Sequence, residues 1–244
     1  MQLSDNARGA VFMSVAMAAF TVNDTCMKLV TEVLPLYQAI FLRGFLTAIA
    51  LLVIGWRMGS LRFRLPAADR KWLTLRSVGE VAGTLLFLSA LRHMPLANLS
   101  AILQFLPLAV TLAAMFFLKE PVGWRRTLAI LAGFVGVLLI VRPGTEGFDR
   151  WSLLGLASVA CVVLRDLSTR RMSSELTSVT IAVTAALSVT VTGIVLVPFD
   201  GWVRVDSGSW ALILVASSFL IAGYLLIVMA MREGEIGLVA PFRY

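Results

Sequence analysis

Apolar residues fall into long runs along this chain, and short polar stretches rich in Arg, Lys, Pro and Gly separate them. Eight of these runs are near 20 residues long, the length with which an α-helix crosses a bilayer. The pattern therefore predicts eight membrane-spanning helices, at residues 9–30, 35–56, 72–91, 98–118, 124–142, 153–170, 177–199 and 210–231. A ninth run begins near Ile236 and stops at Tyr244, which gives only about 13 Å of helix.

Two segments of the first half return in the second half at nearly the same spacing. Residues 82–92 align with 222–232, and residues 18–28 align with 160–170. Two pairs of similar segments at nearly one spacing indicate an internal duplication. Because these segments lie inside apolar runs, the duplicated protein is expected to be a membrane protein. Many secondary transporters are built from such repeated halves.

The duplication also predicts how the two halves lie in the membrane. We place the first repeat at residues 1–150 and the second at 151–244, where it is incomplete. Five helices per repeat make the second half enter from the opposite face, so the repeats are expected to be inverted. Lys and Arg are more than twice as frequent on the cytoplasmic side if the N-terminus is cytoplasmic, which favours that orientation.

Composition supports the membrane class and excludes others. The chain is 59% hydrophobic and 14% charged, with a mean hydropathy of +0.90, whereas a soluble domain has about 25% charged residues. The net charge of +7 arises from basic residues in short loops, without the basic stripe and interleaved aromatics of a nucleic-acid site, so no nucleic-acid partner is expected. Cys26 and Cys161 lie inside apolar runs without metal-binding spacing, so neither a metal nor a cofactor is expected.

Three sequence blocks resemble a known family. PLANLSAILQFLP (95–107), LKEP (118–121) and GFVGVLLI (133–140) resemble the fourth and fifth helices of EamA-type repeats in the drug/metabolite transporter superfamily. The resemblance implies an all-α carrier of two inverted five-helix repeats in a bacterial inner membrane, with about eight and a half of ten helices present here. It also implies alternating access through a central cavity, for a small polar metabolite such as an amino acid, a nucleotide-derived compound or a vitamin. Mapping residues 104–142 onto the second half predicts about forty further residues.

Charged residues inside the predicted helices are the main site candidates, because at a helix centre each costs about 2.5 to 3.5 kcal/mol. Asp24 and Arg43 lie roughly 12 to 15 Å below the same surface in consecutive helices, so we expect them to pair. Two roles stay open for the pair: a structural lock between helices, or contact with a substrate or a proton. Asp166 is the repeat equivalent of Asp24, and the adjacent Arg165 is its expected partner.

Glu80 is a further candidate in the third predicted helix. It follows Arg76 by one helical turn, which predicts an i, i+4 ion pair. The other interpretation makes Glu80 a protonatable carboxylate that lines the cavity.

Two helices that the family resemblance places at the cavity supply the remaining candidates. Asn98 and Gln104 mark one wall, and Arg243 and Tyr244 mark its counterpart, with Tyr244 aligned to Gln104. Arg243 could hold a carboxylate or phosphate of the substrate, or could extend to the membrane interface, while Tyr244 could stack on a ring.

These observations favour a carrier with a small-molecule substrate and the lipid bilayer as partners, and they identify no catalytic residue. A membrane-embedded enzyme is the less favoured alternative, because polyprenyl-type chemistry needs clustered acidic residues that this sequence lacks. A non-transporting remnant or scaffold is another, because the short ninth run leaves an open edge. A homodimer could cover that edge.

Overall fold

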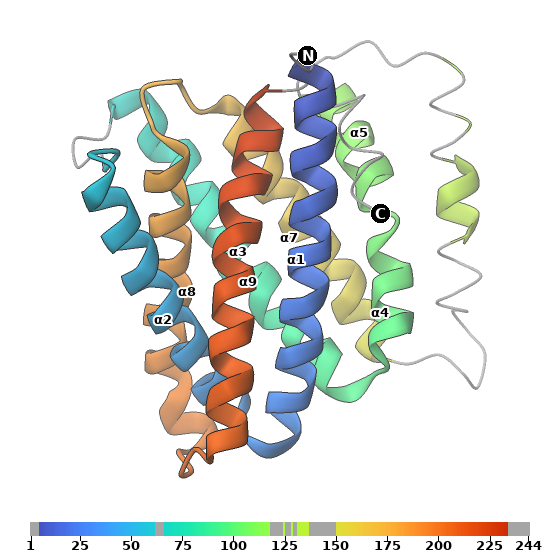
Figure 1. Ribbon diagram of the computed structural model, residues 1–244. Helices are drawn as coiled ribbons and strands as arrows, with labels where there is room; N and C mark the ends of the chain where they lie inside the picture. Colours follow the sequence, from blue (N-terminus) through green and yellow to red (C-terminus); the bar gives the residue numbers. More distant parts are fainter. Residues whose placement is uncertain are drawn as a thin grey trace.

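The computed structural model describes residues 5–61, 66–117, 124, 128, 131–136 and 150–233. In this part of the chain the regular structure consists of helices alone, and the predicted all-α class is confirmed (Figure 1). The elements are α1 (Asp5–Val33), α2 (Leu36–Arg57), α3 (Ala67–His93), α4 (Leu96–Leu103), α5 (Leu106–Phe117), α7 (Arg150–Arg171), α8 (Ser178–Asp200) and α9 (Ser207–Glu233). Seven spans of the described chain are long and apolar enough to cross a membrane, with α4 and α5 forming one of them.

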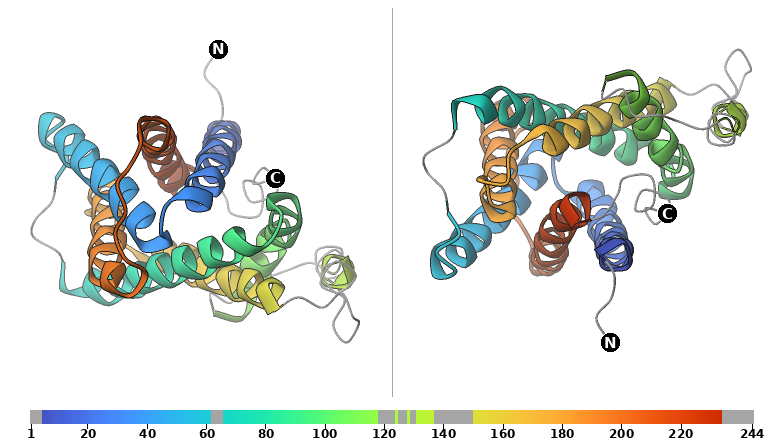
Figure 2. Two further views of the ribbon diagram at one scale, coloured as in Figure 1. Left: turned by 90° about the horizontal axis from the view of Figure 1, so that it is seen from below. Right: turned by 90° about the horizontal axis from the view of Figure 1, so that it is seen from above.

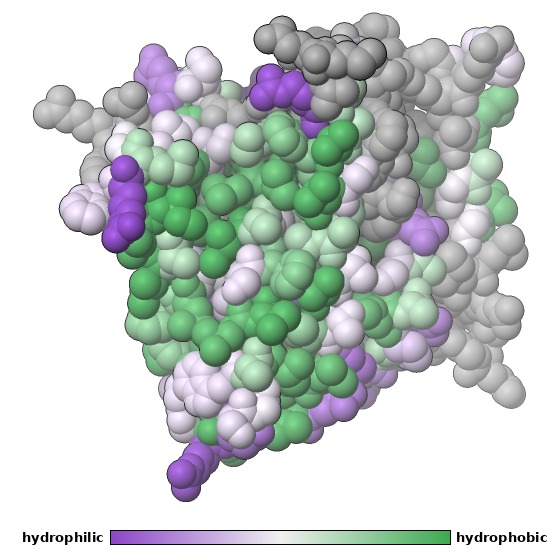
Figure 3. Space-filling model, viewed as in Figure 1, coloured by the Kyte–Doolittle hydropathy of each residue, from purple (hydrophilic) through white to green (hydrophobic). Residues whose placement is uncertain are grey.

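The surface of the bundle matches the membrane class. Figure 3 shows a broad apolar band across the middle of the visible face and hydrophilic residues toward its two ends. Large apolar side chains such as Ile49 on α2 and Leu214 on α9 are exposed, with 44% and 53% of their surface accessible. A protein that leaves so many apolar side chains outside needs lipid around it.

The fourth predicted helix is interrupted near its middle. The sequence predicts one helix at 98–118, whereas α4 ends at Leu103 and α5 begins at Leu106. Pro107 has no N–H to donate to the carbonyl of Leu103, and its ring crowds the preceding turn, so the ladder breaks there. Gln104 and Phe105 form the turn between the two pieces. Of the fifth predicted helix, 124–142, the structure describes residues 124, 128 and 131–136 as helical, and the ninth run at 236–244 lies outside the described residues.

Each of the three most extensive helix pairs joins the first half of the chain to the second. Helix α1 packs along α9, α3 packs along α7, and α2 packs along α8. The end-on views of Figure 2 show these pairs arranged around the middle of the bundle. A helix therefore buries its apolar face mainly against the other half and not against its neighbour in sequence.

Aligned residues of the two halves meet in two of these pairs. A Cβ on Gly223 of α9 would lie 2.7 Å from the ring of Phe20 on α1, and a Cβ on Gly83 of α3 would lie 3.7 Å from Val162 on α7. The two pairs of similar sequence segments align Gly83 with Gly223 and Phe20 with Val162. The α1·α9 and α3·α7 contacts thus use corresponding residues.

Polar contacts between the halves also close both ends of the bundle. At one end, the Asp200 end, the Asp200 carboxylate accepts the N–H of Leu36 at the start of α2 (2.5 Å), and the Gln38 amide exchanges two hydrogen bonds with the backbone of Val203. At the opposite end, the Asp69 end, the Asp69 carboxylate accepts both the N–H and the hydroxyl of Ser173 (2.9 and 2.5 Å).

The start of α9 has its own cap. The Asp206 carboxylate accepts the hydroxyl of Ser209 at 2.5 Å and the N–H groups of Ser209 and Gly208. These hydrogen bonds, that of the Ser209 hydroxyl first, hold the pKa of Asp206 below its usual value. An ionised carboxylate at a helix N-terminus satisfies N–H groups that have no partner within the helix.

Candidate functional site

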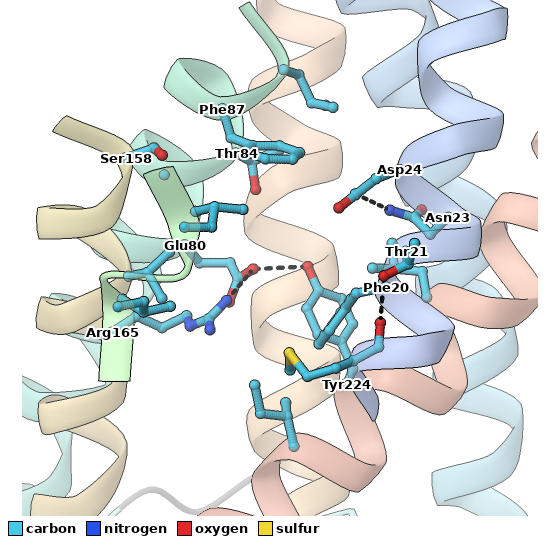
Figure 4. Close-up of a pocket in the computed structure, with 18 of the residues that line it drawn as sticks. Phe20, Thr21, Asn23, Asp24, Glu80, Thr84, Phe87, Ser158, Arg165 and Tyr224 are labelled. Carbon is cyan, nitrogen blue, oxygen red and sulfur yellow. Dashed lines mark hydrogen bonds and ion pairs between the residues drawn. The ribbon is translucent and has the colours of Figure 1, made fainter. Parts of the chain in front are cut away.

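A cavity of about 360 Å³ lies in the interior of the bundle (Figure 4). Its walls come mainly from α1, α3, α7 and α9, and α4 and α5 add Ser100, Leu103 and Leu106. Helix α2 contributes Arg43 alone. Most of these residues lie near the middle of their helices, so the cavity is far from both ends of the spans.

The cavity lies where the two halves of the chain meet, and corresponding residues line it from both sides. The alignment of α1 with α7 places equivalent residues 142 positions apart, and that of α3 with α9 places them 140 apart. Five such pairs have both members in the lining: Phe20 and Val162, Asn23 and Arg165, Glu80 and Leu220, Thr84 and Tyr224, and Phe87 and Ile227. Aligned positions of the two halves therefore recur in the cavity wall, although the paired side chains differ in chemistry.

Asp24 and Arg43 both line the cavity, but an amide lies between them. Asn23 donates its Nδ2 to Asp24 Oδ1 at 2.8 Å, and its Oδ1 accepts Arg43 Nη1 at 3.2 Å. The direct ion pair expected from the sequence is not formed, since no ion pair of the described residues involves Arg43. The physical reason is that Asn23 faces Arg43, and its neighbour Asp24 points about 100° away from it on the same helix.

Arg43 is a buried cation whose hydrogen-bonding capacity is only partly used. Its residue surface is 4% exposed, and its Nε is buried without a partner. The backbone carbonyl of Arg43 accepts the hydroxyls of Thr47 and Ser217, which fixes this part of α2 against α9. The guanidinium is thus held in place at the cavity with donors to spare.

Glu80 on α3 lies opposite Asp24 and is surrounded by partners (Figure 4). Arg76 Nη1 lies 3.4 Å from Glu80 Oε2, which is the i, i+4 pair expected from the sequence, and Arg165 Nη1 lies 3.7 Å from Oε1. The hydroxyl of Tyr224 on α9 donates to Glu80 Oε1 at 3.0 Å. Glu80 therefore links three helices while its side chain also lines the cavity.

Asp166 behaves differently from its repeat equivalent Asp24. It accepts Arg165 Nε at 3.0 Å, as expected, but it is only 3% exposed and does not line the cavity. Arg165 is the member of this adjacent pair that faces the cavity, because neighbours on a helix point about 100° apart. The sequence predicts Arg165 only as the ion-pair partner of Asp166 and not as a cavity residue.

The remaining predicted wall residues lie elsewhere. Asn98 and Gln104 are exposed and are not part of the cavity lining, whereas Ser100 and Leu103, on a different face of α4, do line it. Arg243 and Tyr244 lie outside the described residues. Sequence reasoning did not single out Tyr224, although it occupies the position of Thr84 in the repeated segment, and that equivalence is the signal that could have identified it.

A comparison with protein families identifies the chain. Residues 7–142 match the model of the EamA-like transporter family, which is more than half of the chain. This chain belongs to the EamA-like transporter family. The resemblance seen in the sequence is therefore confirmed, and the seven candidate spans agree with a multi-pass membrane protein.

Relatives of this EamA-like chain include several proteins named as transporters or exporters. It is 25% identical to a riboflavin transporter of Vibrio cholerae, over 96% of this chain and 80% of the relative. It is 26% identical to a pseudopaline exporter of Pseudomonas aeruginosa, over 97% and 82%, and 24% identical to an S-adenosylmethionine uptake transporter of Rickettsia conorii, over 97% and 79%.

A solved crystal structure shares the fold. Its chain is 16% identical and superposes with a TM-score of 0.70 over 93% of the EamA-like chain and 81% of its own. At that identity the similarity shows the fold and not the substrate. Among the described residues, no group of three His, Cys, Asp or Glu side chains is placed to hold a metal ion.

Proposed function

We propose that this chain is a secondary transporter that moves a small polar metabolite across a bacterial inner membrane by alternating access. Substrate enters the central cavity between two inverted repeats, residues 1–150 and 151–244, and leaves on the opposite side. The observation that carries the proposal is the lining of the cavity by five pairs of corresponding residues from the two halves. A site on the axis that relates two inverted repeats is the usual location of substrate in such carriers.

The chemistry of the cavity supports a polar substrate. Asp24, Glu80, Arg43 and Arg165 all line a cavity in the middle of membrane-spanning helices, where charged groups are costly. Phe20, Phe87 and Tyr224 add aromatic surface to the same walls, shown in Figure 4. A volume of about 360 Å³ falls in the range of small-molecule sites.

The contacts at the two ends support alternating access. The Asp200 end joins α8 to the start of α2, and the Asp69 end joins the start of α3 to the segment after α7. Each set of hydrogen bonds connects one half of the chain to the other. Breaking one set while the other persists would open one side of the bundle only, which is the requirement of alternating access.

The substrate classes favoured for this chain are amino acids, nucleotide-derived compounds and vitamins. The named relatives carry riboflavin, S-adenosylmethionine and pseudopaline, and their similarity to this chain extends over nearly its whole length. The basic loop at residues 57–71 supports a cytoplasmic N-terminus, since Lys and Arg gather on the cytoplasmic side.

The test is uptake into proteoliposomes that contain the purified chain, with radiolabelled amino acids, nucleosides, S-adenosylmethionine and riboflavin as a panel. A Thr84→Trp variant fills the cavity with an indole and should abolish the uptake that wild type shows. Val78→Trp is the matched control, because Val78 lies on the same helix with 54% of its surface exposed. If no compound of the panel enters above empty liposomes, or if Thr84→Trp transports like wild type, the proposal fails.

A further inference from the structure

The cavity holds one anion, Asp24, and one cation, Arg43, that form no close ion pair with any described residue. The ion pairs of the described residues assign Glu80 to two arginines and Arg165 to two acids, and they include neither Asp24 nor Arg43. Each of these two groups makes its side-chain hydrogen bond to the same amide, that of Asn23. Two charges at membrane depth with so few partners are costly unless a ligand supplies opposite charges and hydrogen bonds.

The Asn23 amide shows which chemical groups could bind Asp24 and Arg43 at once. It presents a donor nitrogen to Asp24 and an acceptor oxygen to Arg43, and standard bond lengths place these two atoms about 2.3 Å apart. The head group of an α-amino acid presents an ammonium donor and a carboxylate acceptor about 2.7 Å apart. The amide and the zwitterion therefore offer the same pair of groups in the same order at nearly the same spacing.

We infer that the cavity binds the α-amino acid head group of its substrate, with the ammonium on Asp24 and the carboxylate on Arg43 in place of the Asn23 amide. This inference rests on the proposed transport function and narrows its substrate class. The Arg43 guanidinium has unused donors, including its buried Nε, and can hold a carboxylate by two parallel hydrogen bonds. Asp24 lines the cavity and can accept an ammonium directly.

Charge balance explains why both ends of the zwitterion are needed. A ligand with an ammonium alone completes Asp24 and leaves Arg43 without an anion, and a simple carboxylate does the reverse. A buried polar group left without a partner costs its full desolvation penalty, so either one-charge analogue should bind more weakly. Glu80 differs from Asp24 in this scheme, because Arg76 and Arg165 already balance its charge, although its Oε2 accepts no hydrogen bond from the described residues.

The rest of the cavity indicates the side chain of that amino acid. Phe20 and Tyr224 meet edge to face with ring centroids 6.3 Å apart, and Phe87 also lines the cavity (Figure 4). These rings offer apolar and aromatic surface beyond the head-group site. Amino acids with apolar or aromatic side chains fit this surface better than those with a second charge.

The first test uses the wild-type chain and matched ligands. Purified protein in lipid nanodiscs is titrated with the common L-α-amino acids, and L-phenylalanine is compared with phenethylamine and 3-phenylpropionate, which each keep the ring and lose one charge. We expect an apolar or aromatic amino acid to bind, and each one-charge analogue to bind about 10- to 100-fold more weakly. Equal binding of an analogue, or the absence of binding by every amino acid, overturns the inference.

The second test assigns the two ends of the ligand. Asp24→Asn should lower the affinity for the amino acid and leave the affinity for 3-phenylpropionate nearly unchanged. Arg43→Gln should also lower the affinity for the amino acid, but should leave the affinity for phenethylamine nearly unchanged. Thr25→Ser is the control, because Thr25 is an exposed residue of the same helix. If both variants lower the affinity for all three ligands equally, the pair has no direct role and the inference fails.

The uptake panel distinguishes failure of the amino acid site from failure of the proposed transport function. Transport of riboflavin or a nucleoside without any amino acid overturns the amino acid site and leaves the carrier function standing. Absence of transport for every compound overturns the carrier function itself.

Discussion

Replacement of Glu80 by Gln should be among the most destabilising single changes in the membrane-spanning part of this protein. Glu80 is 5% exposed, and its carboxylate lies 3.4 Å from Arg76 and 3.7 Å from Arg165. In wild type, two arginines face two acids, Glu80 and Asp166. Gln at position 80 leaves Arg165 with Asp166 and leaves Arg76 without an ion pair among the described residues. Removal of one partner from a buried pair costs about 3 to 5 kcal/mol of unfolding free energy.

A second change should recover part of that loss. Arg76→Gln alone leaves Glu80 with Arg165 and Tyr224, so it should cost about 1 to 3 kcal/mol. In the double variant, Arg165 and Asp166 remain as a balanced pair, so Glu80→Gln and Arg76→Gln together should cost less than the sum of their separate effects. The expected coupling is about 1 kcal/mol or more.

The measurement is unfolding by SDS in mixed micelles, followed by tryptophan fluorescence. Glu175→Gln makes the same chemical change at an exposed loop residue and should stay within about 0.5 kcal/mol of wild type. The reasoning is refuted if Glu80→Gln unfolds like this control, or if the two changes add to within about 0.5 kcal/mol.

Two further predictions concern packing and orientation. Gly193→Ala should cost about 1 to 3 kcal/mol in the same assay, because its Cβ would lie 2.8 Å from the backbone nitrogen of Phe41. Gly136→Ala should be neutral or stabilising, because a Cβ there would meet no atom of the described residues within 4 Å. Equal effects of the two changes would contradict the close approach of α2 and α8. In a background without the native cysteines, an impermeant thiol reagent should label Trp202→Cys in intact cells and Met58→Cys only after permeabilisation, and the reverse pattern would invert the proposed topology.

The aligned segments carried no information about which residues meet the cavity. They identified Asp24 and Asp166 as counterparts, yet Asp24 lines the cavity and Asp166 does not. Likewise the i, i+4 spacing predicted the contact of Arg76 with Glu80. It did not predict that Arg165 and Tyr224 contact the same carboxylate. Those two residues come from other helices, and no local spacing encodes their approach.

The sequence by itself located the seven spans that the described chain contains. The second helix, for example, was expected at 35–56 and is found at Leu36–Arg57, because the length of an apolar run and its flanking proline and basic residues act locally. Only the tertiary structure decided which face of each helix meets the cavity. That face depends on the rotation of a helix about its axis, which is set by contacts such as Gly223 against Phe20 and Gly44 against Thr190. For the same reason the Asn23 amide, and not a direct ion pair, came to lie between Asp24 and Arg43.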